Sequence, residues 1–349
     1  MKNKKIRIGI SVGDLNGIGM EVIIKTFLDN RMLDFCTPII FGSFKTASYH
    51  KKILNIKNFS INTIKSLNDI SDKKINLVDS WEDDVKINLG TPSKKIGKYA
   101  YLSLKRSIEA LKEKKIDGLV TAPINKHSVQ ENFPEFIGHT ELLSNEFSGE
   151  STMMMVSESM KIACLTSHIP LSKVPEMITQ ELIIKKIKNI HSSLIKDFKI
   201  IKPKIAVMGL NPHAGENGLM GKEELNVIIP AIKCLKSDYN ILCFGPYSAD
   251  SFFTRKNLVK FDGILSMYHD QGLTPFKTLS FSEGVNYTSG LSVVRTSPAH
   301  GTAFDIAGKK IANEQSFRES IYLASKIIQN RRDFEKLKEN PLIVKTEEN

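Results

Sequence analysis

The sequence predicts an α/β fold in which helices cover a mainly parallel sheet, and two observations support this prediction. The chain has 349 residues, of which 41% are hydrophobic and 25% charged, so it has the composition of a globular protein long enough for two domains. Short runs rich in β-branched residues also alternate with longer segments of helical period, which is typical of parallel sheets with helical crossovers.

The alternation can be followed along the chain from its N-terminus. Strands are predicted over residues 6–12, 117–123, 161–167 and 204–210, and each is followed by a helix, over residues 16–30, 139–148, 181–198 and 222–236. The apolar run FDGIL at 261–265 predicts a further strand, which ends shortly before His269. Ligands of such sheets bind outside the carboxyl ends of the strands, so the residues just after each run are candidates for a site.

Composition disfavours several classes of protein. The formal net charge is +11, but only eight of the 49 basic residues are Arg, and the Lys residues are scattered among Ile and Asn without a basic stripe. We therefore expect no nucleic-acid partner. The N-terminal apolar run is short and is interrupted by Asp14, which predicts neither a signal peptide nor a membrane span. Four widely spaced cysteines without a C-x-x-C pair fit a reducing compartment, so we expect a cytoplasmic protein with no membrane partner.

Three of the eight histidines follow a predicted strand in the same way. KIACLTSH ends at His168, KIAVMGLNPH at His213 and FDGILSMYH at His269. Three neutral imidazoles at one edge of a sheet form a recurrent catalytic metal shell that leaves a position open for substrate. Because none of the spacings is local, three unrelated loop histidines remain the alternative.

Further polar residues suggest an anion site. Gly138-His139-Thr140 opens a helical run whose free N–H groups favour an anion, although Thr140 could simply cap that helix. Lys277, Asn286 and Arg295 suit a carboxylate or phosphate, with Arg as the bidentate partner. Lys277 could also relay protons in catalysis.

Three other observations concern single residues and one turn. Asp250 and Asp270 could orient imidazoles or Lys277.

His50 and His191 lie in Lys-rich helical stretches and are predicted to be exposed. The turn GDLNGIG, residues 13–19, follows a strand and opens a helix, but it matches neither the Rossmann nor the Walker pattern, so a conventional nucleotide site is disfavoured.

A series of motifs in order resembles a known family. They are GDLNGIGMEV, TAPINK, GHTELL, TSHIPL, GLNPHAGENG, GPYSAD, YHDQGLTPFK and VNYTSGLSVVRTSPAHGTAFDIAG. Together they resemble the 4-hydroxythreonine-4-phosphate dehydrogenase family of vitamin B6 biosynthesis, from about Gly9 to about Ala324. The family's usual first loop, GDPAGIGPE, is GDLNGIGME here. The segment HGTAFDIAGKKIAN is also similar to the cofactor loop of isocitrate and isopropylmalate dehydrogenases, which bind NAD without the Rossmann fingerprint.

The resemblance implies a fold of two α/β/α domains, like that of isocitrate and isopropylmalate dehydrogenases, with the active site in the cleft between them. One domain would comprise residues 1–125 plus 290–349 and carry the cofactor loop, and residues 126–289 would form the metal, substrate and dimerisation domain. The implied activity is oxidation of 4-phosphooxy-L-threonine by NAD or NADP, followed by loss of CO2 to give 3-amino-2-oxopropyl phosphate.

The resemblance also implies roles for individual residues. The implied metal ligands, for one Zn, Mg or Co ion, are His168, His213 and His269, contributed by both subunits of a homodimer. The implied substrate contacts are His139, Thr140, Lys277, Asn286 and Arg295, and the implied cofactor contacts are His300, Gly301, Thr302 and Asp305.

Three alternatives stay open from the sequence. The closest is a dehydrogenase of a related phosphorylated hydroxy acid, such as phosphothreonate or phosphoerythronate. A metal-dependent hydrolase would use the same three histidines to activate water, but it would not explain the HGTAFDIAG loop. A basic binding protein without chemistry would leave the strand-end histidines unexplained.

Overall fold

The computed structural model describes residues 5–339, and one mixed sheet of 12 strands runs through this part of the chain. The strands are β1 (Arg7–Ser11), β2 (Thr37–Gly42), β3 (Asn62–Ile64), β4 (Asn76–Asp79), β5 (Gly118–Thr121), β6 (Gly149–Val156), β7 (Lys161–Cys164), β8 (Lys204–Met208), β9 (Leu242–Tyr247), β10 (Gly263–Ser266), β11 (Val285–Leu291) and β12 (Arg295–Pro298). Their order in the sheet is β3-β4-β2-β1-β5-β12-β11-β6-β7-β10-β8-β9.

Most neighbouring strands run parallel. Eight of the eleven strand pairs are parallel, and the three antiparallel pairs all involve β6 or β11 in the middle of the sheet. The predicted α/β class with a mainly parallel sheet is therefore confirmed.

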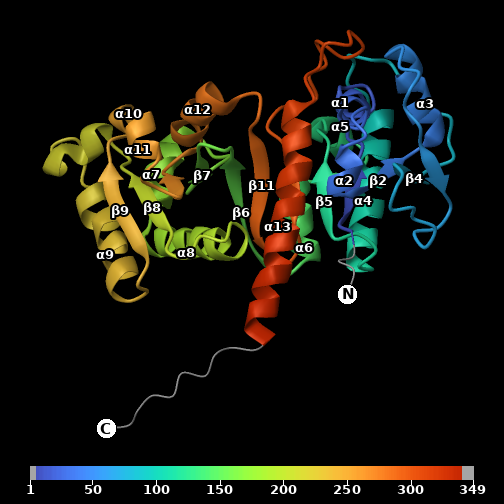
Figure 1. Ribbon diagram of the computed structural model, residues 1–349. Helices are drawn as coiled ribbons and strands as arrows, with labels where there is room; N and C mark the ends of the chain where they lie inside the picture. Colours follow the sequence, from blue (N-terminus) through green and yellow to red (C-terminus); the bar gives the residue numbers. More distant parts are fainter. Residues whose placement is uncertain (1–4, 340–349) are drawn as a thin grey trace.

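Helices cover the sheet along its whole length (Figure 1). They are α1 (Gly19–Thr26), α2 (Met32–Phe35), α3 (Phe44–Ile53), α4 (Lys94–Lys112), α5 (Lys126–Gln130), α6 (His139–Glu146), α7 (Val174–Met177), α8 (Gln180–Lys196), α9 (Ile229–Ser237), α10 (Ala249–Phe252), α11 (Arg255–Leu258), α12 (His269–Ser280) and α13 (Gln315–Glu339). The four predicted strand and helix pairs are present as β1 and α1, β5 and α6, β7 and α8, and β8 and α9. No helix in residues 5–339 is long and apolar enough to cross a membrane.

The apolar core lies on both faces of the sheet because strand residues alternate in direction. On β2, Ile40 belongs to a large cluster that also contains side chains of α1, α8, α9 and α13. Its neighbours Ile39 and Phe41 belong to a second cluster, under α4. A third cluster joins Phe276 of α12 to Ile264 of β10. The sheet is thus buried on both faces, as mainly parallel sheets require.

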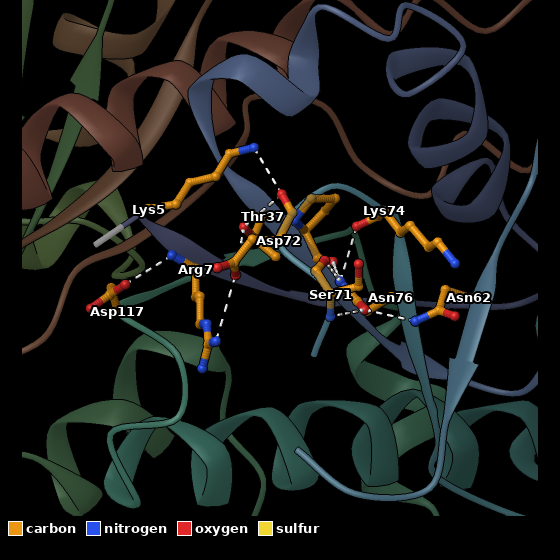
Figure 2. Close-up of polar contacts among 10 residues, drawn as sticks. Lys5, Arg7, Thr37, Asn62, Ser71, Asp72, Lys74, Asn76 and Asp117 are labelled. Carbon is orange, nitrogen blue, oxygen red and sulfur yellow. Dashed lines mark hydrogen bonds and ion pairs between the residues drawn. The ribbon is translucent and has the colours of Figure 1, made fainter. Parts of the chain in front are cut away.

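Buried polar contacts fix the amino ends of the first strands. Asn76, at the start of β4, is fully buried, and its Nδ2 donates to the carbonyl oxygens of Pro38, Ser71 and Lys74 at 3.3, 2.9 and 2.9 Å. Its Oδ1 accepts from Nδ2 of Asn62 at 3.1 Å (Figure 2). Nearby, the backbone N–H of Arg7 donates to Asp117 Oδ2 at 2.8 Å. These bonds hold the amino ends of β1, β3 and β4 in place.

The division into two domains stays a prediction. The sheet is continuous across both predicted segments, and the predicted boundary between residues 289 and 290 falls inside β11. Residues 1–4 and 340–349 of the predicted first domain lie outside the described residues.

The predicted exposure of His50 is wrong. Its side chain is buried on α3 together with Thr46 and Ala47, which lie one turn earlier on the same helix face. Burial lowers the pKa of His50 to about 4, so the ring is neutral. A Lys-rich helix can still bury one face, and His191 on α8 is half-buried for the same reason.

Candidate functional site

A cavity of about 290 Å³ lies where the carboxyl ends of four strands meet. Thr121 at the end of β5, His168 after β7, His269 after β10 and the segment 297–301 at the end of β12 all line it. The walls therefore come from both segments that were predicted to form separate domains. This is the edge of the sheet at which the sequence placed the functional residues.

Helix α12 presents one face to this cavity. His269, Leu273 and Lys277 are four residues apart and all line the cavity, as expected for positions that stack on one side of a helix. Gly272 lets the helix lie close to the sheet, since a Cβ there would lie 2.5 Å from Ser266 Oγ. The strand end at β10 and the helical period together fix where His269 and Lys277 lie.

Two of the predicted metal ligands face each other. The rings of His168 and His269 have their centroids 5.7 Å apart. The Nδ1–H of His269 donates to Asp270 Oδ1 at 2.7 Å, which leaves its Nε2 free to bind a metal. Burial, and then the charge of Lys126, lower the pKa of His168, which favours the neutral imidazole that binds metals.

The third predicted ligand, His213, lies elsewhere in this chain. It is exposed, has a φ of 52°, and begins a run of six residues with positive φ, 213–218, between β8 and α9. His213 and Asp250 do not line the cavity. Asp250 accepts a hydrogen bond from Ser248 Oγ at 2.6 Å, and this bond, with a smaller effect of His213, lowers the pKa of Asp250. Within residues 5–339, no three His, Cys, Asp or Glu side chains come together as a metal site.

Arg295 is a buried cation that bonds to no acidic side chain, although the charge of Glu141 acts on it. Its side chain is 3% exposed. Its Nε and Nη2 donate to Thr121 Oγ1 at 3.1 and 2.6 Å, and its Nη1 donates to Thr288 Oγ1 at 3.2 Å. Burial lowers the pKa of Arg295 to about 10. A guanidinium bonded only to hydroxyl groups in a buried site is costly unless an anion joins it.

Other groups at the cavity are also unpaired. His139 Nε2, Asn286 Oδ1 and His300 Nε2 are buried and have no hydrogen-bond partner. Lys277 is exposed, and its ammonium forms no bond with the described residues. The described residues that line the cavity include no Asp or Glu. Groups arranged in this way suit a small anionic ligand with both donors and acceptors.

Thr140 does not line the cavity, and it does not cap α6. The N-cap residue of α6 is Gly138, and no side chain bonds to the first turn. Burial, followed by the charges of Arg295 and Lys126, lowers the pKa of His139 well below its ordinary value. His139 is therefore a neutral ring at the cavity wall.

The predicted cofactor residues are divided between the cavity and a neighbouring turn. His300 and Gly301 line the cavity, whereas Thr302 and Asp305 do not. The carbonyl oxygen of Thr302 accepts from the N–H of Ile18 at 3.0 Å. A Cβ at Gly17 would lie 2.8 Å from that same oxygen, so glycine permits the close approach. The segment 300–305 is thus held against the 13–19 turn that the sequence singled out.

Asp14, in that turn, carries a buried carboxylate. It is 1% exposed, its Oδ1 accepts from the N–H of Asn16 at 2.9 Å, and its Oδ2 has no partner. Burial raises the pKa of Asp14 to about 6, against the lowering effect of the N–H groups of Asn16 and Gly17. Folding therefore favours the protonated acid, and this stabilisation is lost as the pH rises from 3.8 through 6.

We expect Asp14→Asn to remove this pH dependence. The stability of the variant relative to the wild type should rise by roughly 1.4 kcal/mol between pH 5 and pH 8, because only the wild type must ionise a buried carboxyl. Urea unfolding of both proteins at the two pH values measures this difference. Parallel pH curves for the two proteins would show that Asp14 titrates normally.

Sequence reasoning missed three residues at this site. Thr121 and Thr288 hold Arg295, and Lys126 lines the cavity at the start of α5. Thr121 and Lys126 stand at the two ends of the motif TAPINK, which follows a strand end in the same way as the histidines do. Applying the strand-end rule to β5 would have found Thr121 and the loop that leads to Lys126.

Comparison with known proteins finds a family model, described as pyridoxal phosphate biosynthetic protein PdxA, that matches residues 34–324. A 4-hydroxythreonine-4-phosphate dehydrogenase of Bacteroides thetaiotaomicron is 48% identical over 345 residues, covering 98% of this chain and 94% of that protein. A Clostridium botulinum protein named "Putative D-threonate 4-phosphate dehydrogenase" is 37% identical, covering 93% of this chain and 98% of the relative. The solved structure of 4-hydroxythreonine-4-phosphate dehydrogenase from Klebsiella pneumoniae superposes with a TM-score of 0.81 at 30% identity, covering 94% of this chain and 100% of that one.

Proposed function

This chain belongs to the PdxA family of pyridoxal phosphate biosynthetic proteins, and from that premise we propose that it oxidises 4-phosphooxy-L-threonine. A nicotinamide cofactor, NAD in this proposal, accepts the hydride. The oxidised amino-keto acid then loses CO2 to give 3-amino-2-oxopropyl phosphate. We place the enzyme in the cytoplasm, which agrees with its four free cysteines.

The observation that carries the proposal is the charge of the cavity. Its lining includes Arg295 and Lys277 but no Asp or Glu among the described residues. Arg295 is buried and bonded only to hydroxyl groups. A substrate with a carboxylate and a phosphate supplies the missing anions, and its remaining polar groups would meet the unpaired atoms of His139 and Asn286.

One chain supplies two of the three proposed ligands of a divalent metal. His168 and His269 lie ring to ring, and Asp270 orients the His269 ring. We propose that His213 of a second subunit completes the set, because His213 is exposed in its own chain and does not line the cavity there. When bound, a divalent cation would lower the pKa of a coordinated alcohol and polarise a carbonyl. This arrangement makes the enzyme an obligate homodimer.

The side chains of the chain itself place the substrate. Arg295 and Lys277 would hold its anionic groups, while the neutral His139 ring would bond to it without adding charge. Lys277 is exposed on the same face of α12 as His269. From this position its amine could also accept a proton from the substrate or donate one to it. The cofactor would bind along His300, Gly301, Thr302 and Asp305, next to the 13–19 turn.

A second candidate substrate is a phosphorylated hydroxy acid such as D-threonate 4-phosphate. The Clostridium botulinum relative carries that substrate in its name and covers nearly the whole chain. Both compounds have a carboxylate and a phosphate, so the cations that line the cavity suit either one.

One assay separates the candidates. NADH formation is measured with 4-phosphooxy-L-threonine, D-threonate 4-phosphate and erythronate 4-phosphate, each with and without a chelator. We expect the amino acid to have the highest kcat/KM and the chelator to abolish turnover. A higher kcat/KM for a hydroxy acid would select the second candidate. Phosphate release without NADH would indicate a hydrolase.

A further inference from the structure

Lys126 is a third cation at the cavity, and none of the roles described above uses it. It lines the same cavity as Arg295 and Lys277. Its position is fixed by the chain before it, because the side chain of Asn125 accepts the N–H of Ser128 at 2.8 Å and so starts α5 at Lys126. The lysine is therefore presented from a defined turn directly after the carboxyl end of β5.

The ammonium of Lys126 lies beside the start of α6. A Cβ built on Gly138 would lie 3.2 Å from Lys126 Nζ, so the missing side chain of glycine leaves room for it. The next residue is His139, whose Nε2 is buried and unpaired. Lys126 and His139 thus bring two unsatisfied polar groups to the same wall of the cavity.

No described residue neutralises Lys126 through a direct bond. Its ammonium makes no hydrogen bond or ion pair with any side chain or backbone group in residues 5–339. Glu141 Oε2 lies 2.7 Å from the same Gly138 position, so a carboxylate is close but is not bonded to the lysine. The positive charge of Lys126 also contributes, after burial, to the lowered pKa of both His139 and His168. The charge of Lys126 therefore acts on groups that line the cavity.

We propose that Lys126 binds the phosphate end of the substrate, an assignment that rests on the proposed function. The two cations differ in character. Arg295 is buried and planar, which suits a carboxylate, whereas Lys126 is exposed, flexible and strongly hydrated, which suits a solvated phosphate dianion. The phosphate then lies beside Gly138, next to Lys126 Nζ, and the carboxylate lies at the Arg295 guanidinium.

The test compares Lys126→Ala with the wild type on two substrates. With 4-phosphooxy-L-threonine, kcat/KM should fall by roughly 10- to 100-fold, mostly through KM, and Lys126→Arg should restore much of it. With 4-hydroxythreonine, which lacks the phosphate, the two proteins should differ by less than about 3-fold. Lys236→Ala, an exposed lysine of α9, is the matched control and should behave as the wild type.

Binding of inorganic phosphate, measured by calorimetry, tests the assignment without turnover. We expect the Kd to rise roughly 10-fold in Lys126→Ala and to stay unchanged in Lys236→Ala. Equal losses on both substrates, or unchanged phosphate binding, would overturn the assignment. If the wild type fails to oxidise 4-phosphooxy-L-threonine at all, the proposed function fails, and phosphate binding still decides the role of Lys126.

Discussion

Replacing His269 by Ala is expected to lower NADH formation by more than roughly 100-fold and to remove most of the bound divalent metal. In the structure the ring centroids of His269 and His168 are 5.7 Å apart. The Nδ1 of His269 is bonded to Asp270, which leaves Nε2 for the metal. Loss of either imidazole leaves a single ligand from this chain. Metal analysis of purified protein, together with the activity assay, measures both effects. Full metal content in His168→Ala and His269→Ala would show that the two rings do not bind the ion.

Mixing variants tests whether the metal site is shared between subunits. His213→Ala and His269→Ala chains, unfolded and refolded together, should regain about a quarter of the wild-type activity, because half of the dimers are hybrids and each hybrid has one intact site of two. His168→Ala mixed with His269→Ala is the matched control. It should regain nothing, since those two histidines come from the same chain. Equal recovery in both mixtures, or an active monomer in sedimentation, would contradict the shared site.

The second large effect is expected at Arg295. Arg295→Lys keeps the charge but loses the planar group that reaches Thr121 and Thr288, so kcat/KM should fall by roughly 10- to 1,000-fold, or about 1.4 to 4 kcal/mol. The KM for NAD should hardly change. Arg295→Met should be inactive yet as stable to heat as the wild type without substrate, or more stable, because it removes a buried cation that bonds only to hydroxyl groups.

Variants of Gly301 and Asp305 test cofactor binding, whereas Arg295→Lys tests substrate binding. A Cβ at Gly301 would meet no atom within 4 Å, so Gly301→Ala does not disturb the protein itself. If the cofactor approaches this backbone, as we propose, Gly301→Ala or Asp305→Ala should weaken NAD binding and leave metal content intact. Weaker NAD binding in Arg295→Lys, as large as its loss of substrate use, would instead place the arginine at the dinucleotide.

Much of the candidate site could be predicted from local sequence. The rule that functional residues follow strand ends predicts His168, His213 and His269, and their strands, β7, β8 and β10, are indeed neighbours in the sheet. Lys277 lies where a helical period counted from His269 places it, on the cavity face of α12. The predicted exposure of His50 is wrong because it relies on the Lys-rich composition of the whole helix. Burial depends instead on which face of the helix packs against the core.

The sequence by itself determined the kinds of element, the edge of the sheet that carries the chemistry and the types of donor found there. These properties depend on residues that are adjacent in the chain, through periodicity and through the position at which a strand ends. The tertiary structure alone decided which donors share a cavity. Arg295 bonds to Thr121 across 174 positions of sequence, His213 does not line the cavity that His168 lines, and Lys126 Nζ lies beside Gly138. Contacts of this kind arise from long-range strand order and packing, which no local pattern encodes.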